Sequence, residues 1–294
     1  MRVGLLLKPH QPEALAIARE LCSALAARKV EAVAIGAPPG SLPDARDVPE
    51  EALADAALLV VLGGDGTLLH GAELVADRGV PILGINLGHL GFLTSSPPEL
   101  GRATLEQALD GKLPVDRRLR LRVQLRRRGG ETVVRYACND AVISQGALAR
   151  LMEFETALDG RPITTYRADG LILATPTGST AYSLAAGGPI LTPDVEAMVM
   201  TPICPHTLTH RPLVVPAASR VTIQLGAAAR NVQLTVDGQW GTGLENGDRV
   251  EVHAANKPLL LFRPAETSYF EILEAKLHWG GNVPNGTPGR TPRR

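Results

Sequence analysis

The feature that most constrains the fold is a short apolar run that breaks into three glycines around an aspartate. The run LLVVL at residues 58–62 is followed at once by GGDGT at residues 63–67. A buried strand that ends in glycines and then opens a helix presents backbone N–H groups to a phosphate. A carboxylate repels phosphate, so Asp65 needs a task of its own, such as holding a cation or accepting a proton from a hydroxyl. The segment therefore predicts phosphoryl transfer to an alcohol.

The first third of the chain alternates strand-like runs with helical patterns. Strands are expected at residues 3–7, 30–35, 57–62 and 80–85, and helices at residues 13–27 and 67–76. Strands separated by helices imply a parallel sheet that is covered on both faces, with the ligand site at the carboxyl ends of the strands. Asp65 would lie at such an end. We therefore predict an α/β domain over residues 1–113.

The pattern changes near Pro114, where residues 119–126 alternate apolar and polar side chains as a strand with one solvated face does. Further strands are expected at residues 142–143, 171–174, 213–215, 221–225, 232–236, 250–252 and 259–262. Residues 114–266 are thus expected to form an all-β domain. A helix over residues 267–279 is expected to return to the first domain, and residues 280–294, rich in Gly, Pro, Asn and Arg, to be disordered.

Composition excludes several classes of protein. The net charge of zero gives no electrostatic attraction to nucleic acid or membrane, and 3% aromatic residues argue against stacking platforms for single strands. No segment approaches the roughly 18 uninterrupted apolar residues of a membrane span. The three cysteines, Cys22, Cys138 and Cys204, fit neither a disulfide framework nor a zinc spacing. We therefore expect buried thiols in a reducing cytoplasm.

The longest motif follows the strand expected at residues 171–174. It reads TPTGSTAYS over residues 175–183, and a helix is expected to start inside this hydroxyl cluster. Small hydroxyls at a helix start can bind the polar groups of a ligand, although helix capping would explain one or two of them. Ser179 as an acyl-transfer nucleophile is a weak alternative because no G-x-S-x-G elbow surrounds it. A Walker A loop is also missing.

Three smaller features complete the set of candidates. The motif NLGHLGFL at residues 86–93 has glycines that allow close backbone approach, either to a ligand or between loops. His89 is expected to be structural and Phe92 to line the core or a pocket. Asn139 and Asp140 offer an amide and a carboxylate at a strand start, and residues 237–239 close another strand. Turn chemistry explains both of these features equally well.

Taken together, these residues closely resemble the NAD kinase family in its bacterial form. The match runs through GGDGT at 63–67, NLGHLGFL at 86–93, DGLILATPTGSTAYSL at 169–184, AGGPI at 186–190, PHTL at 205–208 and Arg211-Pro212. The resemblance covers roughly residues 1–278. It implies an N-terminal α/β domain, a C-terminal β-sandwich and a site between them. It also implies transfer of the γ-phosphoryl of ATP to the 2′-hydroxyl of the adenosine ribose of NAD, giving NADP and ADP.

The resemblance also implies residue roles and partners. Asp65 would accept the proton, and Mg²⁺ or another divalent cation would neutralise the phosphates, although no metal ligand can be named. The resemblance further implies a homodimer or homotetramer in which a neighbouring subunit completes the NAD site. The phosphates of ATP would lie on Gly63, Gly64, Gly66 and Thr67. NAD would be bound by Asp65, Gly66, Asn139, Asp140, Arg150, Arg167, Asp169, Thr180, Ala181, Tyr182, Ser183, Leu184, Ala185 and Gln239.

One departure and three rival functions bear on this assignment. The family usually has Asn-Glu where this chain has Asn139-Asp140, and one methylene less shortens the reach of the carboxylate by about 1.5 Å. A lipid or sphingoid-base kinase shares the GGDG loop but would require an apolar acceptor pocket or a membrane-facing patch. A phosphofructokinase-like sugar kinase would require a basic cluster, and none stands out. A non-catalytic dinucleotide sensor would bind NAD without turnover, and the intact Asp65 argues against it.

Overall fold

The apolar strands of the N-terminal third pair with one another in a seven-stranded sheet. In the computed structural model, which describes residues 1–75, 78–88, 91–94, 96–146, 152–207, 209–226, 231–264 and 268–280, the strand order is β3-β2-β1-β4-β5-β19-β6. These strands are β1 (Arg2–Leu7), β2 (Glu31–Ile35), β3 (Ala45–Asp47), β4 (Leu58–Gly63), β5 (Ile82–Asn86), β6 (Val115–Arg118) and β19 (Leu259–Phe262). All neighbours pair in parallel except β6, which pairs antiparallel with β19.

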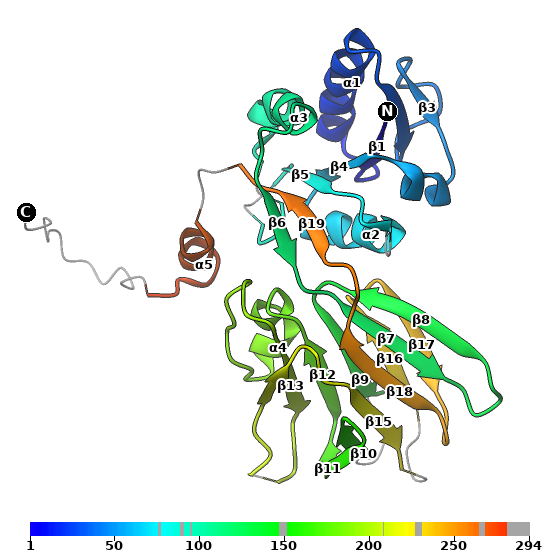
Figure 1. Ribbon diagram of the computed structural model, residues 1–294, viewed down its shortest axis with the longest axis vertical. Coiled ribbons are helices and arrows are strands. Elements are labelled where there is room, and N and C mark those ends of the chain that lie inside the picture. Colours follow the sequence, from blue (N-terminus) through cyan, green and yellow to red (C-terminus); the bar gives the residue numbers. More distant parts are fainter. Residues whose placement is uncertain are drawn as a thin grey trace, which may run out of the picture.

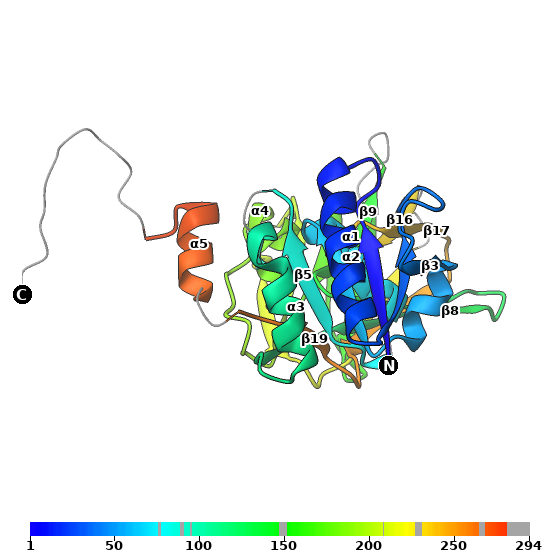
Figure 2. The same ribbon diagram turned by 90° about the horizontal axis from the view of Figure 1, so that it is seen from above.

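Helices cover both faces of this sheet, which explains why its central strands β1, β4 and β5 are mostly apolar and buried. On one face, α1 (Pro12–Ala27) and α3 (Gly101–Leu109) lie against each other (Figure 2). On the other face lie α2 (Asp65–Val75) and the short 3-10 helix η1 (Glu50–Asp55). Alternate side chains of β1 divide between two apolar clusters, with Leu5 on the α1 face and Leu6 on the α2 face. None of the helices that the structure describes is long and apolar enough to cross a membrane.

The second domain is a sandwich of two antiparallel six-stranded sheets, which lies below the first domain in Figure 1. One sheet has the order β11-β10-β15-β18-β7-β8 and the other β14-β13-β12-β9-β16-β17. The strands are β7 (Leu121–Arg126), β8 (Thr132–Ala137), β9 (Asp140–Gln145), β10 (Met152–Leu158), β11 (Arg161–Ala168), β12 (Gly170–Ala174), β13 (Ala197–Ile203), β14 (Leu213–Pro216), β15 (Val221–Leu225), β16 (Val232–Val236), β17 (Trp240–Leu244) and β18 (Arg249–Ala254). The main apolar core lies between the two sheets. The predicted fold class, an α/β domain followed by a β-sandwich, is confirmed.

Within residues 114–266, the predicted extent of the second domain, the first and the last strand lie outside the two sheets of the sandwich. Strand β6 and strand β19 belong to the first sheet, where Leu261 of β19 pairs with Ile82 of β5. Leu259 and Leu261 pack in the same apolar cluster as helix α2. A short apolar run does not indicate which of two sheets it joins, so the sequence could not place β19.

Two buried arginines tie the domains together at their junction. Arg118 donates from Nε to Asp116 at 2.8 Å and from Nη1 to Oγ1 of Thr177 in the second domain at 3.3 Å. Arg120 donates from Nη2 to the carbonyl of Ala72 in helix α2 at 3.3 Å. A buried charge is tolerated only when it is paired and hydrogen-bonded, so these contacts specify how one domain sits on the other.

The last described helix, α5 (Tyr269–Leu277), contacts both domains rather than returning to the first alone. It begins with a capping box in which Ser268 and Glu271 satisfy each other's backbone N–H groups. The Tyr269 ring lies 6.3 Å from the ring of Phe92, and its hydroxyl donates to the carbonyl of Leu191 at 3.4 Å. Figure 1 shows α5 beside the junction of the domains. The predicted disordered tail lies, from residue 281 on, outside the described residues.

The cysteine predictions are confirmed for two residues and wrong for the third. None of the three forms a disulfide; Cys22 and Cys138 are buried, whereas Cys204 is exposed. Burial raises the pKa of Cys22 to about 11 and that of Cys138 to about 12. Cys204 follows directly after β13, where the chain bends away from the sheet with a φ of 44°.

Candidate active site

The glycine loop lies where strand β4 ends and helix α2 begins. Gly63 is the last residue of β4, and a Cβ there would lie 2.5 Å from Oγ1 of Thr67, so the helix start itself requires glycine. A Cβ on Gly64 or Gly66 would meet no atom of the described residues within 4 Å, and neither backbone is left-handed. The space beside these two glycines is therefore open to a ligand, at a helix N-terminus that favours anions.

The carboxylate of Asp65 is held by the loop that follows β5. Its Oδ2 accepts the N–H of Phe92 at 2.8 Å. Its Oδ1 accepts the N–H groups of Leu93 and Thr94 at 3.1 and 3.0 Å and the Thr94 hydroxyl at 3.1 Å. Among the described residues, three donors reach Oδ1 and one reaches Oδ2, so Oδ2 is the oxygen with more room to accept a further hydrogen bond.

Gly91 makes this arrangement possible. A Cβ at position 91 would lie 2.0 Å from Oδ1 of Asp65 and 2.4 Å from Oγ1 of Thr94, so only glycine lets the loop close over the carboxylate. The sequence predicted close backbone approach by the glycines of residues 86–93. The structure shows that, at Gly91, the approached group is Asp65. His89 and Leu90 lie outside the described residues.

A pocket of ≈ 540 Å³ at the glycine loop is lined by residues of both domains. Gly64, Gly66 and Thr67 line one side, and Gln239, from the turn between β16 and β17, lines the other. This places the predicted residue Gln239 opposite the predicted phosphate loop. Three side chains that sequence reasoning missed also line the pocket, namely Lys8, Glu50 and His70. For Lys8 a signal existed, because it follows β1, the strand beside β4, at the same edge of the sheet.

Asp237 organises the segment that contains Asn139 and Asp140. Its carboxylate accepts the backbone N–H groups of Cys138, Asn139 and Asp140 at 2.7, 2.7 and 3.0 Å. Hairpin turning was the predicted alternative for residues 237–239, and Asp237 and Gly238 do take the left-handed backbone of such a turn. The Asp237 side chain has this second task, which sequence reasoning did not detect.

Asp140 is a buried carboxyl group whose pKa lies well above its ordinary value. It is 6% exposed, and burial, together with the neighbouring charge of Asp237, raises its pKa from 3.8 to about 7. Burial also raises the pKa of Asp237, against the opposing effect of its three backbone donors. The predicted site therefore contains two close carboxyl groups, of which Asp140 changes charge near neutral pH.

The raised pKa of Asp140 predicts a pH-dependent loss of stability. Between about pH 4 and pH 7 the folded protein keeps a proton that the unfolded chain has released, so stability falls as the pH rises through this window. Above it, the loss is complete and constant. We expect Asp140→Asn to remove this loss. When the pH is raised from 5 to 8, the free energy of unfolding of the variant should increase by about 2 kcal/mol relative to that of the wild type. Urea unfolding at both pH values measures this, and parallel pH profiles for the two proteins would contradict it.

The hydroxyl groups of the loop after β12 mainly form hydrogen bonds within the protein. Four of these hydroxyls have partners within the second domain: Thr175 donates to Cys138 O at 2.5 Å, Ser179 to Pro176 O at 2.6 Å, Thr180 to Thr177 O at 3.1 Å, and Ser183 pairs with Thr201 at 2.9 Å. A Cβ on Gly178 would lie 2.1 Å from Asn139 O, so the loop also packs on the segment before β9. The hydroxyl cluster is therefore first a device that folds this loop beside Asn139 and Asp140. Ala181, Tyr182 and Ala185 remain exposed.

The structure does not bring all predicted NAD residues together. Asp140 pairs with Ala174 at one end of β12, whereas Asp169 precedes Gly170 at the other end. At about 3.3 Å per residue, the five residues of β12 separate these groups by about 16 Å. Arg167 also lies at the far end, where it binds Glu153 at 2.5 Å, and Asp169 accepts from Gln145 at 3.1 Å. Arg150 lies outside the described residues.

The described residues contain no group of three or more His, Cys, Asp or Glu side chains arranged to hold a metal ion. Among the described residues that line the pocket near the glycine loop, Glu50 is the single carboxylate, and its Oε1 lies 3.3 Å from Nε2 of His70. Mg²⁺ is commonly bound by one or two carboxylates together with the phosphates of a substrate. The pocket therefore fits a cation that a phosphate ligand brings with it.

Comparison with known proteins yields matches over nearly the whole chain. Residues 3–113 match the family model of the ATP-NAD kinase N-terminal domain, and residues 138–263 match that of the ATP-NAD kinase C-terminal domain. An NAD kinase of Geotalea daltonii is 45% identical over 286 residues, which cover 95% of this chain and 99% of that protein. An NAD kinase of Geobacter sulfurreducens is also 45% identical, with the same coverage.

Two solved structures share the arrangement of both domains. The yeast NADH kinase in complex with NADH matches with a TM-score of 0.88 and 28% identity, over 98% of this chain and 90% of that one. An NAD kinase from Archaeoglobus fulgidus in complex with ATP matches with a TM-score of 0.74 and 25% identity, over 95% of this chain and 99% of that one.

Proposed function

The chain belongs to the NAD kinase family, and we propose that the pocket between the glycine loop and Gln239 is where it performs the reaction of that family. The protein is a phosphotransferase that moves the γ-phosphoryl of ATP to the 2′-hydroxyl of the adenosine ribose of NAD, giving NADP and ADP. One observation carries our assignment of the site. Gly64 and Gly66, which have free space beside them, and the carboxylate of Asp65 lie together at the end of β4, at a pocket that Gln239 of the second domain also lines.

In the proposed mechanism, positioning and charge neutralisation matter more than base strength, because phosphoryl transfer has a loose transition state. The N–H groups beside Gly63, Gly64, Gly66 and Thr67 bind the phosphates. Oδ2 of Asp65, which accepts from one donor among the described residues, orients the 2′-hydroxyl and accepts its proton late in the reaction. The donors on Oδ1 keep the carboxylate from turning away.

We propose that Mg²⁺, or another divalent cation, enters with ATP. Glu50, in the lining of the pocket, is the carboxylate placed to contribute to its binding. When bound, the cation neutralises charge on the phosphate oxygens. The residues of the chain then align the donor and exclude water around the transfer.

On the acceptor side, we propose that NAD contacts Asn139, Asp140, Gln239 and the segment Thr180–Ala185 near the transfer site. Asp140 replaces the glutamate usual in the family, and its deep burial limits its reach further. Because Arg167 and Asp169 lie at the far end of β12, we assign them, together with Arg150, to the NAD site of a neighbouring subunit.

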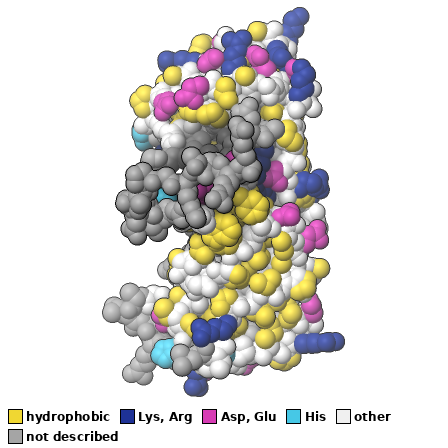
Figure 3. Space-filling view, turned by 90° about the vertical axis from the view of Figure 1, so that its left-hand side faces the viewer, with side chains coloured by type: hydrophobic (Ala, Val, Ile, Leu, Met, Phe, Trp, Pro, Cys, Tyr) yellow, Lys and Arg dark blue, Asp and Glu magenta, His cyan; other side chains and the backbone are white. Residues whose placement is uncertain are grey.

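This assignment requires an oligomer, and we propose a homodimer or homotetramer. Figure 3 shows hydrophobic side chains gathered over one side of the second domain. Val195, Leu213 and Val214 are large apolar residues exposed in this domain, the last two on the edge strand β14. Exposed apolar surface of this kind is typical of protein interfaces. We further propose a cytoplasmic location, where ATP and NAD are available and free thiols stay reduced.

If Asp169 grips NAD, replacing it with alanine should affect the acceptor alone. We expect Asp169→Ala to raise KM for NAD by about tenfold, as the loss of a charge-assisted hydrogen bond does, with KM for ATP nearly unchanged. Steady-state kinetics with each substrate varied in turn measures both constants. An equal rise in the two KM values would point to a disturbed domain junction and contradict the assignment.

Gly66 offers a test of the phosphate loop that separates ligand from fold. Alanine at this position has free space and ordinary backbone angles, and in the first turn of α2 it should stabilise the fold by about 0.5–1 kcal/mol. The same methyl would stand where the phosphates bind, so we expect KM for ATP to rise at least about tenfold. Thermal unfolding and kinetics measure the two effects. An unchanged KM for ATP would remove Gly66 from the phosphate site.

The function itself is tested by an assay of NADP formation from NAD, ATP and Mg²⁺, with each component omitted in turn. We expect NADP to form only when all three are present. Replacing ATP with inorganic polyphosphate, and NAD with NADH, measures the choice of donor and acceptor. Binding of NAD by calorimetry without any NADP formation would contradict the enzyme assignment and favour a dinucleotide sensor.

A further inference from the structure

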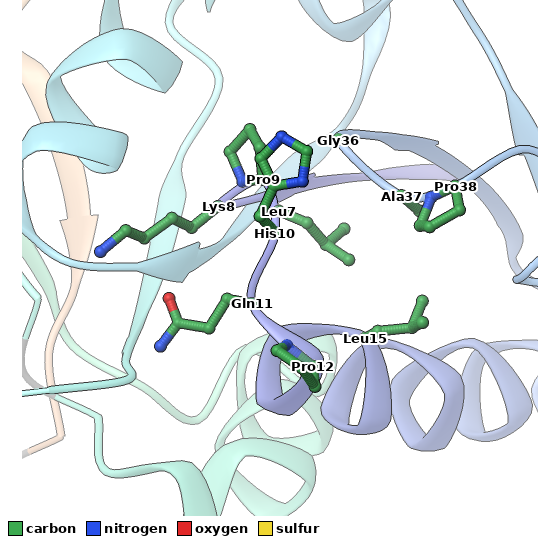
Figure 4. Close-up of a pocket in the computed structure, with 10 residues that line it drawn as sticks. All are labelled: Leu7, Lys8, Pro9, His10, Gln11, Pro12, Leu15, Gly36, Ala37 and Pro38. Carbon is green, nitrogen blue, oxygen red and sulfur yellow. The ribbon is translucent and has the colours of Figure 1, made fainter.

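Two glutamines, Gln11 and Gln145, have a buried side-chain oxygen that accepts no hydrogen bond from the described residues. Gln11 lines the pocket shown in Figure 4, which shares four of its lining residues with the pocket at the glycine loop. Gln11 therefore belongs to the site described above. Gln145 lies instead in the second domain, as the last residue of β9, and none of the roles assigned above uses it.

Gln145 stands opposite Asp169 where β9 and β12 lie side by side. The register pairs Ser144 with Gly170, and one residue further along, the N–H of Gln145 donates to the carbonyl of Asp169 at 3.1 Å. A Cβ on Gly170 would lie 2.5 Å from the carbonyl oxygen of Ile143, so only glycine lets the two strands run this close together. The two side chains meet as a result, and Nε2 of Gln145 donates to Oδ1 of Asp169 at 3.1 Å.

The Gln145 amide is oriented at the expense of its own oxygen. Because the oxygen would be repelled by the carboxylate of Asp169, the nitrogen must face it. Oε1 is then left buried without a donor from the described part of the chain, which lowers the stability of the fold. A leucine, of similar size, would carry no such unsatisfied group. The amide is therefore unfavourable for packing and useful for what it does to Asp169.

We propose that Gln145 is a positioning residue for the binding of NAD, an inference that rests on the assignment of Asp169 to the NAD site of a neighbouring subunit. The amide holds Oδ1 of Asp169, whereas Oδ2 accepts no hydrogen bond from the described residues. Oδ2 is thereby presented to a hydrogen-bond donor of NAD, which is a hydroxyl or an amino group. The nearby Arg167 is engaged by Glu153, so among the described side chains Gln145 alone orients this carboxylate.

The test is a double-mutant cycle of Gln145→Leu and Asp169→Ala in the full chain. Calorimetry with NAD and with AMP-PNP, each with Mg²⁺, measures the dissociation constants, and thermal unfolding measures Tm. We expect Gln145→Leu to weaken NAD binding about three- to tenfold, with AMP-PNP binding unchanged and Tm equal or higher. The double variant should bind NAD as weakly as Asp169→Ala alone, because Gln145 acts through Asp169.

Gln233→Leu is the matched control for this substitution. Gln233 is exposed on β16, where it pairs with Ser144 beside Gln145, and it makes no contact with Asp169. We expect this variant to bind NAD and AMP-PNP as the wild type does.

Gln145→Glu adds a readout that a purely structural role would not move. At pH 8 the introduced carboxylate repels Asp169, whereas its protonated form donates to Oδ1 as the amide does. We therefore expect weak NAD binding at pH 8 and recovery towards the wild-type value as the pH falls to about 5.5. The wild-type profile, measured in parallel, accounts for the titration of Asp140 and for the charges of Glu153 and Arg167.

Four results would overturn the inference, and they can be told apart. Unchanged NAD binding in Gln145→Leu, with weaker binding in Asp169→Ala, would show that the amide is not needed. Losses that multiply in the double variant would mean that Gln145 does not act through Asp169. A lower Tm with equal losses for NAD and AMP-PNP would make Gln145 structural. Unchanged NAD binding in Asp169→Ala would overturn both the inference and the assignment on which it rests. A wild-type protein that binds NAD but forms no NADP would instead contradict the proposed reaction alone.

Discussion

Replacing Asp65 with asparagine is expected to lower kcat by about 10²–10⁴, the usual contribution of a positioned proton acceptor, with the fold intact. The amide can keep its oxygen towards the three donors on the Oδ1 side. Its nitrogen would then replace Oδ2, face the N–H of Phe92 and leave the 2′-hydroxyl without an acceptor. Turnover at saturating ATP and NAD, together with thermal unfolding, measures the two parts of the prediction.

Thr94→Val is the matched control for this variant. It removes one donor from Oδ1 of Asp65 and leaves the carboxylate in place, in a side chain of similar shape that is fully buried. We expect kcat to fall far less than in Asp65→Asn. Turnover of Asp65→Asn at the wild-type rate would remove Asp65 from the reaction. Equal losses in the two variants would mean that the carboxylate serves only to hold the loop.

Gly91→Ala is expected to lower kcat by about 100-fold although Gly91 has no part in the proposed substrate contacts, because a 1 Å misplacement of Asp65 can cost that much. The added Cβ would lie 2.0 Å from Oδ1 of Asp65, so either the carboxylate or the loop of residues 92–94 must move. Either movement breaks the hydrogen bonds that aim Oδ2. Because the proposed phosphate site lies on the glycines of the neighbouring loop, we expect KM for ATP to change little.

Gly88→Ala separates this steric effect from a general effect of alanine in the same segment. A Cβ on Gly88 would meet no atom of the described residues within 4 Å, and its backbone is not left-handed. We expect Gly88→Ala to keep the contacts of Asp65 and to lose much less turnover than Gly91→Ala. Similar kcat values for Gly91→Ala and the wild type would contradict the view that the loop aims the carboxylate.

Local signals in the sequence predicted most of the fold and the centre of the site. The run of residues 58–62 and the glycines after it place Asp65 at the end of a buried strand, where the structure has it. The alternation at residues 119–126 predicted β7, whose side chains do alternate between buried and partly exposed. These features depend on neighbours in the chain, so a single sequence reveals them.

Features that depend on distant partners could not be predicted. The contact of Gly91 with Asp65 joins residues 26 positions apart, and nothing in the spacing identifies the partner. The capture of three N–H groups by Asp237 spans almost a hundred positions. The hydroxyls of Ser179 and Ser183 were expected to be available to a ligand, but both form hydrogen bonds within the chain. A hydroxyl that can bind a ligand can equally well bind a group of its own chain, and the sequence does not indicate which.

The placement of β6 and β19 has a consequence for how the molecule is made. The chain leaves the first sheet through β6, builds the whole sandwich and re-enters beside β6 through β19. During synthesis, Gly84 and Asn86 on this edge of β5 can bind Ser96 early, whereas the start of β5 at Ile82 gains its strand partner only when residues 259–262 have emerged from the ribosome. The sandwich can form as a unit before that time, whereas the first sheet is completed only after it. The sheet whose strand β4 leads into Asp65 is therefore the first to begin and the last to be completed.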